Sequence, residues 1–232
     1  MTERRGLSAA ALKYIAIAAM LTDHIGWVFF PQMTPLSFVM HVFGRLTAPI
    51  MCYFIAEGYF YTRNLKRYFA RLLLGAAISH FAYGLCFHGA LFYGLRTGVM
   101  WTLAVGLAAL VLVKRYPAGD IRAFLGVLVC FVLALPGDWS VYAVSWIVWF
   151  GRTHGDRRQQ LLGLALIGGV FAMSNLTAGI ENAFQLGVLL AVPLLRQYNG
   201  QRGAHHPKAL FYWFYPVHLL LLAAVRYFVS GG

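Results

Sequence analysis

Long apolar segments separated by short polar ones recur along the whole chain. Nine of these segments are predicted to be membrane-spanning helices, and their ranges are 9–30, 36–61, 68–87, 98–114, 121–136, 139–150, 160–174, 182–196 and 209–229. A bilayer core about 30 Å thick needs about 20 residues of α-helix, so the sixth segment, WSVYAVSWIVWF, is short for a full crossing. The pattern predicts an all-α, polytopic transmembrane protein with about nine spans.

Composition agrees with this interpretation, because 60% of the 232 residues are hydrophobic and only 11% are charged. Soluble domains keep about a quarter of their residues charged. No polar interval is long enough for a separate soluble domain, so residues 1–232 are expected to form a single transmembrane domain. The first apolar segment contains Asp23 and His24 and lacks a small-residue cleavage site after it, so we expect a retained helix rather than a signal peptide.

The charge distribution predicts the topology. Of 19 Lys and Arg residues, 15 fall in the segments that lie on one side of the membrane if the N-terminus is cytoplasmic. The positive-inside rule therefore predicts a cytoplasmic N-terminus and an outer C-terminus. The net charge of +12 would favour nucleic-acid binding in a soluble protein, but here it follows from topology, and no nucleic-acid partner is expected.

Ionisable side chains within predicted spans are candidates for function, because a charge in the bilayer is costly. They are Asp23, His24, His41, Arg45, Glu57, His80 and His218. A rise of about 1.5 Å per residue places four of them, His24, Arg45, His80 and His218, between the midplane and the outer half. Glu57 lies near the inner end of its span and is expected to pair with Arg63 and Arg71. Pro49 and Pro216 are expected to bend their helices.

Each candidate also has a purely structural interpretation. His41 and His80 would be neutral core histidines bonded to backbone carbonyls, and Asp23 with Arg45 would be an ion pair between the first two spans. The chemical interpretation is that a buried histidine held by a carboxylate acts as a general base near neutral pH. A nearby arginine would hold that carboxylate or stabilise an oxyanion.

A basic cluster follows the second span in TRNLKRYFAR, which contains Arg63, Lys66, Arg67 and Arg71. Such a cluster suits anionic lipid headgroups or the phosphates of a nucleotide-bearing donor. Combined with a buried histidine, it favours a transferase that hands an acyl group across the membrane. A proton-coupled small-molecule transporter would place His, Asp and Arg at similar depths. A non-catalytic scaffold would leave the buried titratable groups unexplained. The three cysteines lie in apolar runs without metal-ligand spacing, so no metal is expected.

Three blocks resemble the signature blocks of the TraX family, membrane proteins named for the acetylase of conjugative F-type pilin. They are LKYIAIAAMLTDHIG (12–26), GRLTAPIMCYFIAEGYFYTRNLKRYFARLLL (44–74) and KALFYWFYPVHLLLL (208–222). MWTLAVGL (100–107) resembles a weaker fourth block. Eight residues fall on family-typical positions: Arg45, Glu57, Gly58, Arg63, Arg71, Tyr215, Pro216 and His218. The third span departs from the family, since AAISHFAY has His80 where the family has an acidic or amide residue.

The resemblance implies an integral acetyltransferase of the bacterial inner membrane that uses cytoplasmic acetyl-CoA. His24 would be the general base, Asp23 would orient it or pair with Arg45, and Arg45 would hold Asp23 or the oxyanion. His218 would line the same cavity as an acid toward the leaving thiolate. Arg63, Lys66, Arg67, Arg71 and Tyr215 would bind the acetyl-CoA. The acceptor, whether a pilin-like peptide, a glycan or a small molecule, is left open, as is a homodimer, and membrane lipid is an expected partner.

Overall fold

A computed structural model describes residues 6–30, 34–203 and 208–229, and within these ranges the regular structure is helical. The elements in order are α1 (Ala9–Phe29), α2 (Pro35–Gly44), α3 (Thr47–Tyr61), α4 (Leu65–His88), α5 (Val99–Arg115), α6 (Ile121–Ala134), α7 (Ser140–Arg152), α8 (Arg157–Leu176), the 3₁₀ helix η1 (Ile180–Leu190), α9 (Ala191–Arg196) and α10 (Lys208–Val229). In the described ranges, β structure is limited to two isolated bridges, Leu7–Tyr198 and Thr97–Gly137.

Several helices begin at a side chain that caps the free backbone N–H groups of the first turn. The Ser8 hydroxyl accepts from the Ala11 N–H at 3.2 Å, and the side-chain oxygen Oδ1 of Asn64 accepts from the Arg67 N–H at 2.8 Å. Asp156 caps α8 in the same way, at 3.0 Å from the Gln159 nitrogen. These polar residues lie between apolar segments, so the interruptions of the hydrophobic pattern coincide with helix starts.

Each of the nine predicted segments contains helix, but two differ in detail. The second is one helical stretch, Pro35–Tyr61, that is interrupted between α2 and α3 at Arg45 and Leu46, both of which keep right-handed helical backbone angles. Pro49 lacks the N–H that would bond to the Arg45 carbonyl, so the helix is interrupted one turn before the proline. The eighth begins as the eleven-residue 3₁₀ helix η1 before α9, and 3₁₀ runs of that length are uncommon.

Among the described residues, four helical stretches are long and apolar enough to cross a membrane by length and composition. They are Pro35–Tyr61, Leu65–His88, Arg157–Leu176 and Tyr212–Val229. Ile121–Ala134 is a shorter apolar helix. These helices mark the chain as a membrane protein, while the count of nine spans and the cytoplasmic N-terminus stay predictions.

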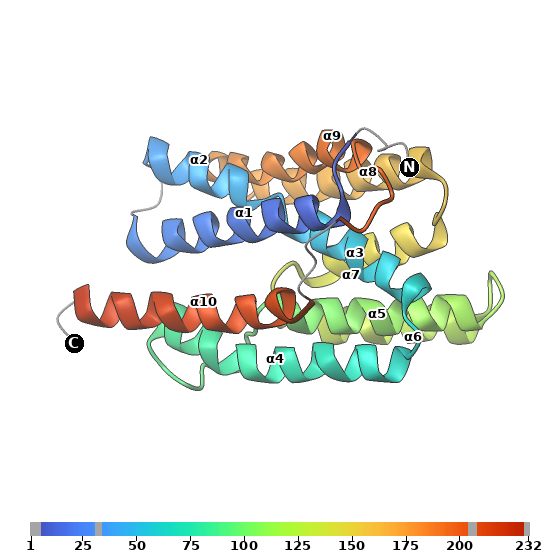
Figure 1. Cartoon of the computed structure of the whole chain (residues 1–232), viewed down its shortest axis with the longest axis horizontal. Coiled ribbons are helices and arrows are strands. Elements are labelled where there is room, and N and C mark those ends of the chain that lie inside the picture. The colour runs from blue at the N-terminus through green and yellow to red at the C-terminus, as the bar shows by residue number, and fades with distance from the viewer. Residues whose placement is uncertain (1–5, 31–33, 204–207, 230–232) are drawn as a thin grey trace.

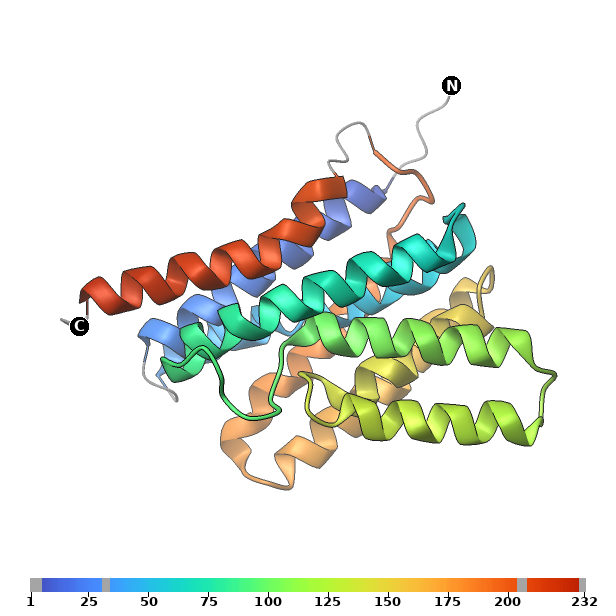
Figure 2. The same cartoon turned by 90° about the horizontal axis from the view of Figure 1, so that it is seen from below.

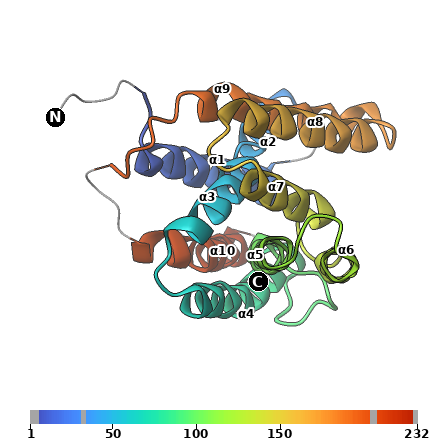
Figure 3. The ribbon, with the colours of Figure 1, turned by 90° about the vertical axis from the view of Figure 1, so that its right-hand side faces the viewer.

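The helices form a bundle in which successive segments run back and forth along the long axis, horizontal in Figure 1. The end-on view in Figure 3 shows α3 and α7 between two groups. One group contains α1, α2, α8 and α9, and the other contains α4, α5, α6 and α10. Packing of α7 against both α3 and α5 joins the groups. We call the end that carries the loops 62–64, 116–120 and 153–156 the basic end; it lies at the right of Figure 1.

At the opposite end, α5, α6 and α7 stop short of α1, α4 and α10, as Figures 1 and 2 show. The turn between α6 and α7 therefore lies inside the length of the bundle rather than at its tip. The loop before α5 meets this turn, since Thr97 N–H donates to the Pro136 carbonyl at 2.9 Å and Asp138 N–H donates to the Thr97 carbonyl at 3.0 Å. Two loops that a helical pattern would place at the surface are thus brought to middle depth.

Candidate functional site

His24 on α1 and His218 on α10 form a buried pair, although 194 residues separate them in sequence. His24 Nδ1 lies 2.7 Å from His218 Nε2, and the two ring planes differ by 2°. Phe87 of α4 meets the His24 ring edge-on at 5.4 Å between centroids. The prediction that these two histidines line one site therefore agrees with their placement, while their catalytic roles stay predictions.

The hydrogen bonds around the pair determine which nitrogen is basic. His218 Nδ1 lies 2.7 Å from the Phe214 carbonyl oxygen, and because a carbonyl only accepts, His218 Nδ1 carries the hydrogen. In a neutral His218 the Nε2 lone pair then accepts, so His24 Nδ1–H is the donor. This assignment leaves the lone pair of His24 on Nε2. The Phe214 carbonyl, His218 and His24 thus form a hydrogen-bonded chain, and the nitrogen at its far end, His24 Nε2, is unprotonated.

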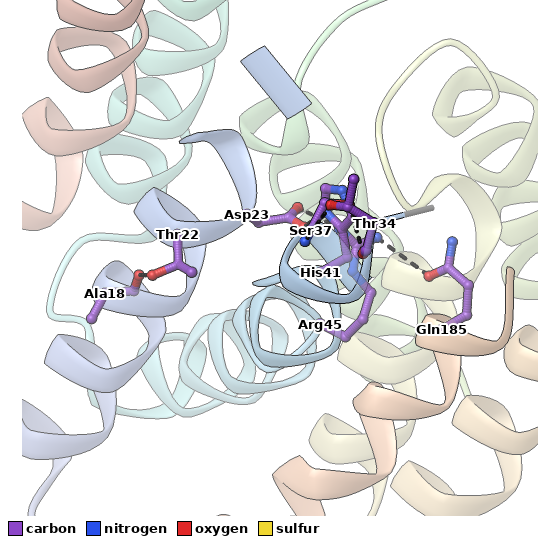
Figure 4. A network of polar contacts seen from close by, with 8 residues as sticks. All are labelled: Ala18, Thr22, Asp23, Thr34, Ser37, His41, Arg45 and Gln185. Carbon is purple, nitrogen blue, oxygen red and sulfur yellow. Dashed lines mark hydrogen bonds and ion pairs between the residues drawn. The ribbon is translucent and has the colours of Figure 1, made fainter. Parts of the chain in front are cut away.

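Asp23 is adjacent to His24 but belongs to a different cluster, shown in Figure 4. Its carboxylate accepts from His41 Nδ1–H at 2.8 Å and from the Arg45 guanidinium. All three residues are buried. Asp23 was expected to orient His24 or to pair with Arg45, and in the structure it pairs with Arg45. The carboxylate-held histidine is His41, which was expected to bond a backbone carbonyl.

Arg45 is enclosed by several elements at the break between α2 and α3. Its Nη1 donates to the Gln185 side-chain oxygen of η1 at 3.3 Å, and its guanidinium lies 5.0 Å from the centre of the Trp139 ring. A β-carbon at Gly44 would overlap the side chain of Asp23. Glycine at this position therefore lets α1 and α2 approach closely enough for the ion pair.

The separation of Asp23 from His24 follows from helix geometry. Successive residues on an α-helix project about 100° apart, and α1 packs against α2 on one side and α10 on the other. Asp23 consequently points toward α2, and His24 points toward α10. Asp23 and His24, although adjacent in sequence, therefore lie in two different environments.

A cavity of about 820 Å³ extends from the basic end toward the histidine pair. Its inner part is bordered by Met100 of α5 and by Pro216 of α10, two residues before His218; His24 and His218 themselves are not among the residues that line it. Three cationic side chains and one carboxylate line it, namely Lys13, Arg71, Arg202 and Glu57, and Glu57 is paired with His154. The Arg71 guanidinium packs on Tyr68 and Tyr212, at 5.9 and 5.5 Å from the ring centres. The cavity therefore combines cations, aromatic rings and an apolar interior.

Several predicted site residues lie elsewhere. Arg63, Lys66 and Arg67 are exposed at the start of α4 and do not line the cavity, unlike Arg71. Lys66 projects away from the cavity, whereas Arg67 is on the same side of α4 as Arg71 but lies one turn closer to the exposed start of the helix, beyond the residues that line the cavity. Tyr215, expected at the donor, is buried beside both histidine rings, and its hydroxyl accepts from the Val99 N–H at 3.3 Å.

Two predictions about ionisable residues were wrong. Glu57 pairs with His154 at 3.1 Å rather than with Arg63 or Arg71, because the loop after α7 reaches the inner end of α3. His80 does not join His24, Arg45 and His218; it is half-buried on α4, where its ring contacts Phe81. The prediction for His80 considered only depth along the helix, and His80 lies on a face of α4 that does not turn toward the other three residues.

Two residues of the site were missed. Gln185 is a single amide within the apolar run AFQLGVLL, which is a signal that sequence reasoning could have used. Trp139 looked like the start of a short span, and nothing in its sequence neighbourhood points to Arg45. Within the described ranges, no group of three or more His, Cys, Asp or Glu side chains is arranged to hold a metal ion.

Comparison with known proteins identifies the family. The model of the TraX protein family matches residues 8–226. The chain is 30% identical to the probable fimbrial assembly protein FimC, serogroup H1, of Dichelobacter nodosus, over 99% of this chain and 100% of that protein. An uncharacterized protein of Rickettsia prowazekii (strain Madrid E) is 35% identical over 21% of this chain and 18% of its own length. No solved structure matches significantly. Because the family model spans nearly the whole chain, this protein is a member of the TraX family.

Proposed function

We propose that the protein is an integral-membrane acetyltransferase that moves an acetyl group from acetyl-CoA to an amine or hydroxyl acceptor. The observation that carries the proposal is the cavity of about 820 Å³, which has cationic side chains toward the basic end and reaches Pro216 of α10, the helix that carries His218. An elongated donor with phosphates at one end and a thioester at the other matches this distribution of charge. Acetyl-CoA is such a donor.

Arg71, with Lys13 and Arg202, would bind the phosphates of the donor in place of the exposed basic cluster. Arginine forms strong charge-assisted hydrogen bonds to phosphate, and stacking on Tyr68 and Tyr212 orients the Arg71 guanidinium. The apolar stretch toward Met100 and Pro216 would hold the pantetheine arm. In the predicted topology the basic end is cytoplasmic, where acetyl-CoA is available.

His24 would act as the general base through Nε2. As the acceptor nitrogen or oxygen adds to the thioester carbonyl, its proton passes to His24 Nε2. The C–S bond then breaks, and the imidazolium returns that proton to the thiolate of CoA. His218 stabilises the intermediate imidazolium by accepting from His24 Nδ1–H. General-base catalysis of this kind contributes about 10²–10⁴-fold.

The acceptor class is drawn from the relatives. The Dichelobacter nodosus relative is described as a probable fimbrial assembly protein, so a pilin-like peptide is one acceptor to test, beside glycans and small molecules. The proposed location is the bacterial inner membrane.

Donor binding is tested with two arginines one turn apart on α4. In lipid nanodiscs, Arg71→Ala should weaken CoA binding at least about tenfold, because a charge-assisted hydrogen bond contributes about 1.5–3 kcal/mol. Arg67→Ala is the matched control and should leave the affinity unchanged. Thermal stabilisation by CoA measures both. Equal affinities in wild type and Arg71→Ala would exclude this cavity as the donor site.

Turnover is tested by release of the CoA thiol from acetyl-CoA in the presence of n-butylamine or n-butanol. Wild type should release thiol only when an acceptor is present. Electrogenic uptake of a small molecule into liposomes, with no thiol release, would instead establish the proton-coupled transporter.

A further inference from the structure

Asp138 occupies an unusual place for a carboxylate. It lies in the turn between α6 and α7, which stops within the length of the bundle rather than at its tip (Figures 1 and 2). Its Oδ1 accepts from the Tyr83 hydroxyl at 3.3 Å, a long hydrogen bond, and Asp138 is itself partly buried. An ionised carboxylate at this depth normally has a cation or several donors as partners.

No cation pairs with Asp138 within the part of the chain that the structure describes. The other five described acids have an ion pair, cap a helix or are exposed. These are Asp23 with Arg45, Glu57 with His154, Asp120 with Arg122, Asp156 at the start of α8, and the exposed Glu181. Asp138 is thus the partly buried acid whose second carboxylate oxygen is free to accept from a ligand.

The backbone holds Asp138 firmly in this position. Its N–H donates to the Thr97 carbonyl at 3.0 Å, and its carbonyl accepts from the Thr102 hydroxyl at 2.8 Å. The next two residues, Trp139 and Ser140, both have positive φ, at 65° and 41°. Positive φ in non-glycine residues is strained and concentrates at functional sites. The fold therefore maintains an unfavourable turn that fixes this carboxylate.

Ring contacts connect Asp138 to the histidine pair. Tyr83, its hydrogen-bond donor, lies 4.9 Å from Phe87, and Phe87 lies 5.4 Å from His24. The donor cavity reaches the start of α5 at Met100, and Thr102, two residues on, bonds the Asp138 carbonyl. The Asp138 turn and the donor cavity therefore meet the same start of α5, and the contacts through Phe87 link that turn to His24.

We propose that Asp138 and Tyr83 form the acceptor subsite, in which the Asp138 carboxylate accepts a hydrogen bond from the N–H or O–H group that receives the acetyl. This subsite rests on the proposed function, since it supplies the second substrate of that reaction. The class of acceptor follows from the chemistry: a carboxylate without a cation binds a polar hydrogen, and binds it most strongly when the donor is an ammonium.

Binding of small probes tests the subsite without requiring turnover. The full chain in nanodiscs, saturated with CoA, is titrated with n-butylammonium, n-butanol or tetramethylammonium, and thermal stabilisation gives each affinity. Wild type should bind n-butylammonium, n-butanol or both, and the difference between them shows whether charge adds to the hydrogen bond. Tetramethylammonium should bind weakly, because it is a cation without an N–H.

Asp138→Asn is the decisive variant, because Asn can still accept from Tyr83 and fill the same volume. It should bind the preferred probe at least about tenfold more weakly than wild type, as expected for loss of a hydrogen bond to a charged group. Tyr83→Phe tests the same subsite through its second member and should also weaken binding. Glu181→Gln, which changes an exposed acid, is the matched control and should bind normally.

Two outcomes overturn the subsite: no binding of either n-butylammonium or n-butanol to wild type, or equal affinity in Asp138→Asn and wild type. Thiol release from acetyl-CoA is measured in the same preparations. Absence of thiol release with intact probe binding would sink the acetyltransferase proposal and leave Asp138 and Tyr83 as a binding site for a polar hydrogen without the role of an acceptor subsite. Normal thiol release with unchanged probe binding in Asp138→Asn would sink the subsite alone.

Discussion

Two adjacent residues of α1 belong to clusters with opposite character. His24 forms a pair with His218 in which each bond joins neutral groups and the last acceptor is the Phe214 carbonyl. Asp23 forms an ionic cluster with Arg45 and His41. Both clusters are buried and both join distant segments of the chain. They differ in charge and in their relation to the donor cavity, which reaches Pro216, two residues before His218.

This difference separates two uses of a polar group in a membrane protein. The His pair keeps an unprotonated nitrogen between two helices, one of which borders the cavity, without the cost of a buried charge. The ionic cluster closes α1 against the break between α2 and α3, and His41 Nε2 has no hydrogen-bond partner in the described structure. We infer that the pair serves chemistry and the ionic cluster serves structure, and each can be altered separately.

The largest effect is expected from His24→Ala. Loss of the general base should lower kcat by about 10²–10⁴-fold, while the melting temperature and CoA affinity change little, because the ion pair remains. Thiol release from acetyl-CoA with n-butylamine measures kcat. Full activity in His24→Ala would assign the chemistry to another group and remove the contrast between the two clusters.

Two substitutions of His218 test the hydrogen bond of the histidine pair, one that can keep an acceptor and one that cannot. In His218→Gln the side-chain carbonyl can accept from His24 Nδ1–H, whereas in His218→Ala nothing can. The Gln variant should therefore keep more activity than the Ala variant. Equal loss in both would mean that the bond between the rings does not set the basicity of His24.

Arg45→Ala should produce the largest loss of stability, because it leaves the Asp23 carboxylate buried without its cation. Breaking one side of a buried ion pair costs about 3–5 kcal/mol, and this is the expected decrease in the free energy of unfolding in mixed micelles. The double variant Asp23→Asn/Arg45→Met removes both charges and should recover part of the loss. An Arg45→Ala protein as stable as wild type but inactive would make the ionic cluster catalytic instead.

The positions of the helices could be predicted from the sequence because apolar run length and polar interruptions act locally. The interruptions at Ser8, Asn64 and Asp156 became helix caps. The interruption at Arg45 was harder to predict, because a proline is compatible with a bend or an interruption of the helix. Which one occurs depends on packing partners such as Gln185 and Trp139, and these come from distant segments.

The depth of the site residues along their helices was predictable, but the direction in which each side chain projects was not. Helical rise placed His24 and His218 at similar heights, and they lie together. Rotation about the helix axis decided the rest. It turned His80 away from the site, whereas Arg67 shares the side of Arg71 and lies one turn beyond the cavity lining. Asp138 was unpredictable for another reason: PGDWS reads as a surface turn, and only the short α5, α6 and α7 bring it inside.

A smaller effect is expected from His41→Phe, which sharpens the assignment of His41 to the ionic cluster. Asp23 loses one charge-assisted donor but keeps Arg45, so the free energy of unfolding should fall by about 1.5–3 kcal/mol. Phenylalanine keeps the ring between Trp27 and Phe184. Thiol release should remain near the wild-type rate. A large drop in kcat with normal stability would instead make His41 a second base.

The smallest effect is expected at Asp120 and Arg122, an ion pair at the start of α6 whose arginine side chain is 68% exposed. Asp120 and Arg122 are the same two residue types as Asp23 and Arg45, but they meet in water rather than inside the bundle. Comparing the two pairs therefore tests the effect of burial. Exposed pairs contribute little, so Arg122→Ala should lower the melting temperature less than Arg45→Ala or His41→Phe. The Arg122 hydrogen bonds hold the pKa of Asp120 below its ordinary value. The lowered pKa means that the pair stabilises the fold at neutral pH and loses this contribution as the pH falls through the folded-state pKa. The difference in melting temperature between wild type and Arg122→Ala should therefore be present at pH 7 and vanish in acid. A difference as large as that of Arg45→Ala would show that burial does not distinguish the two pairs.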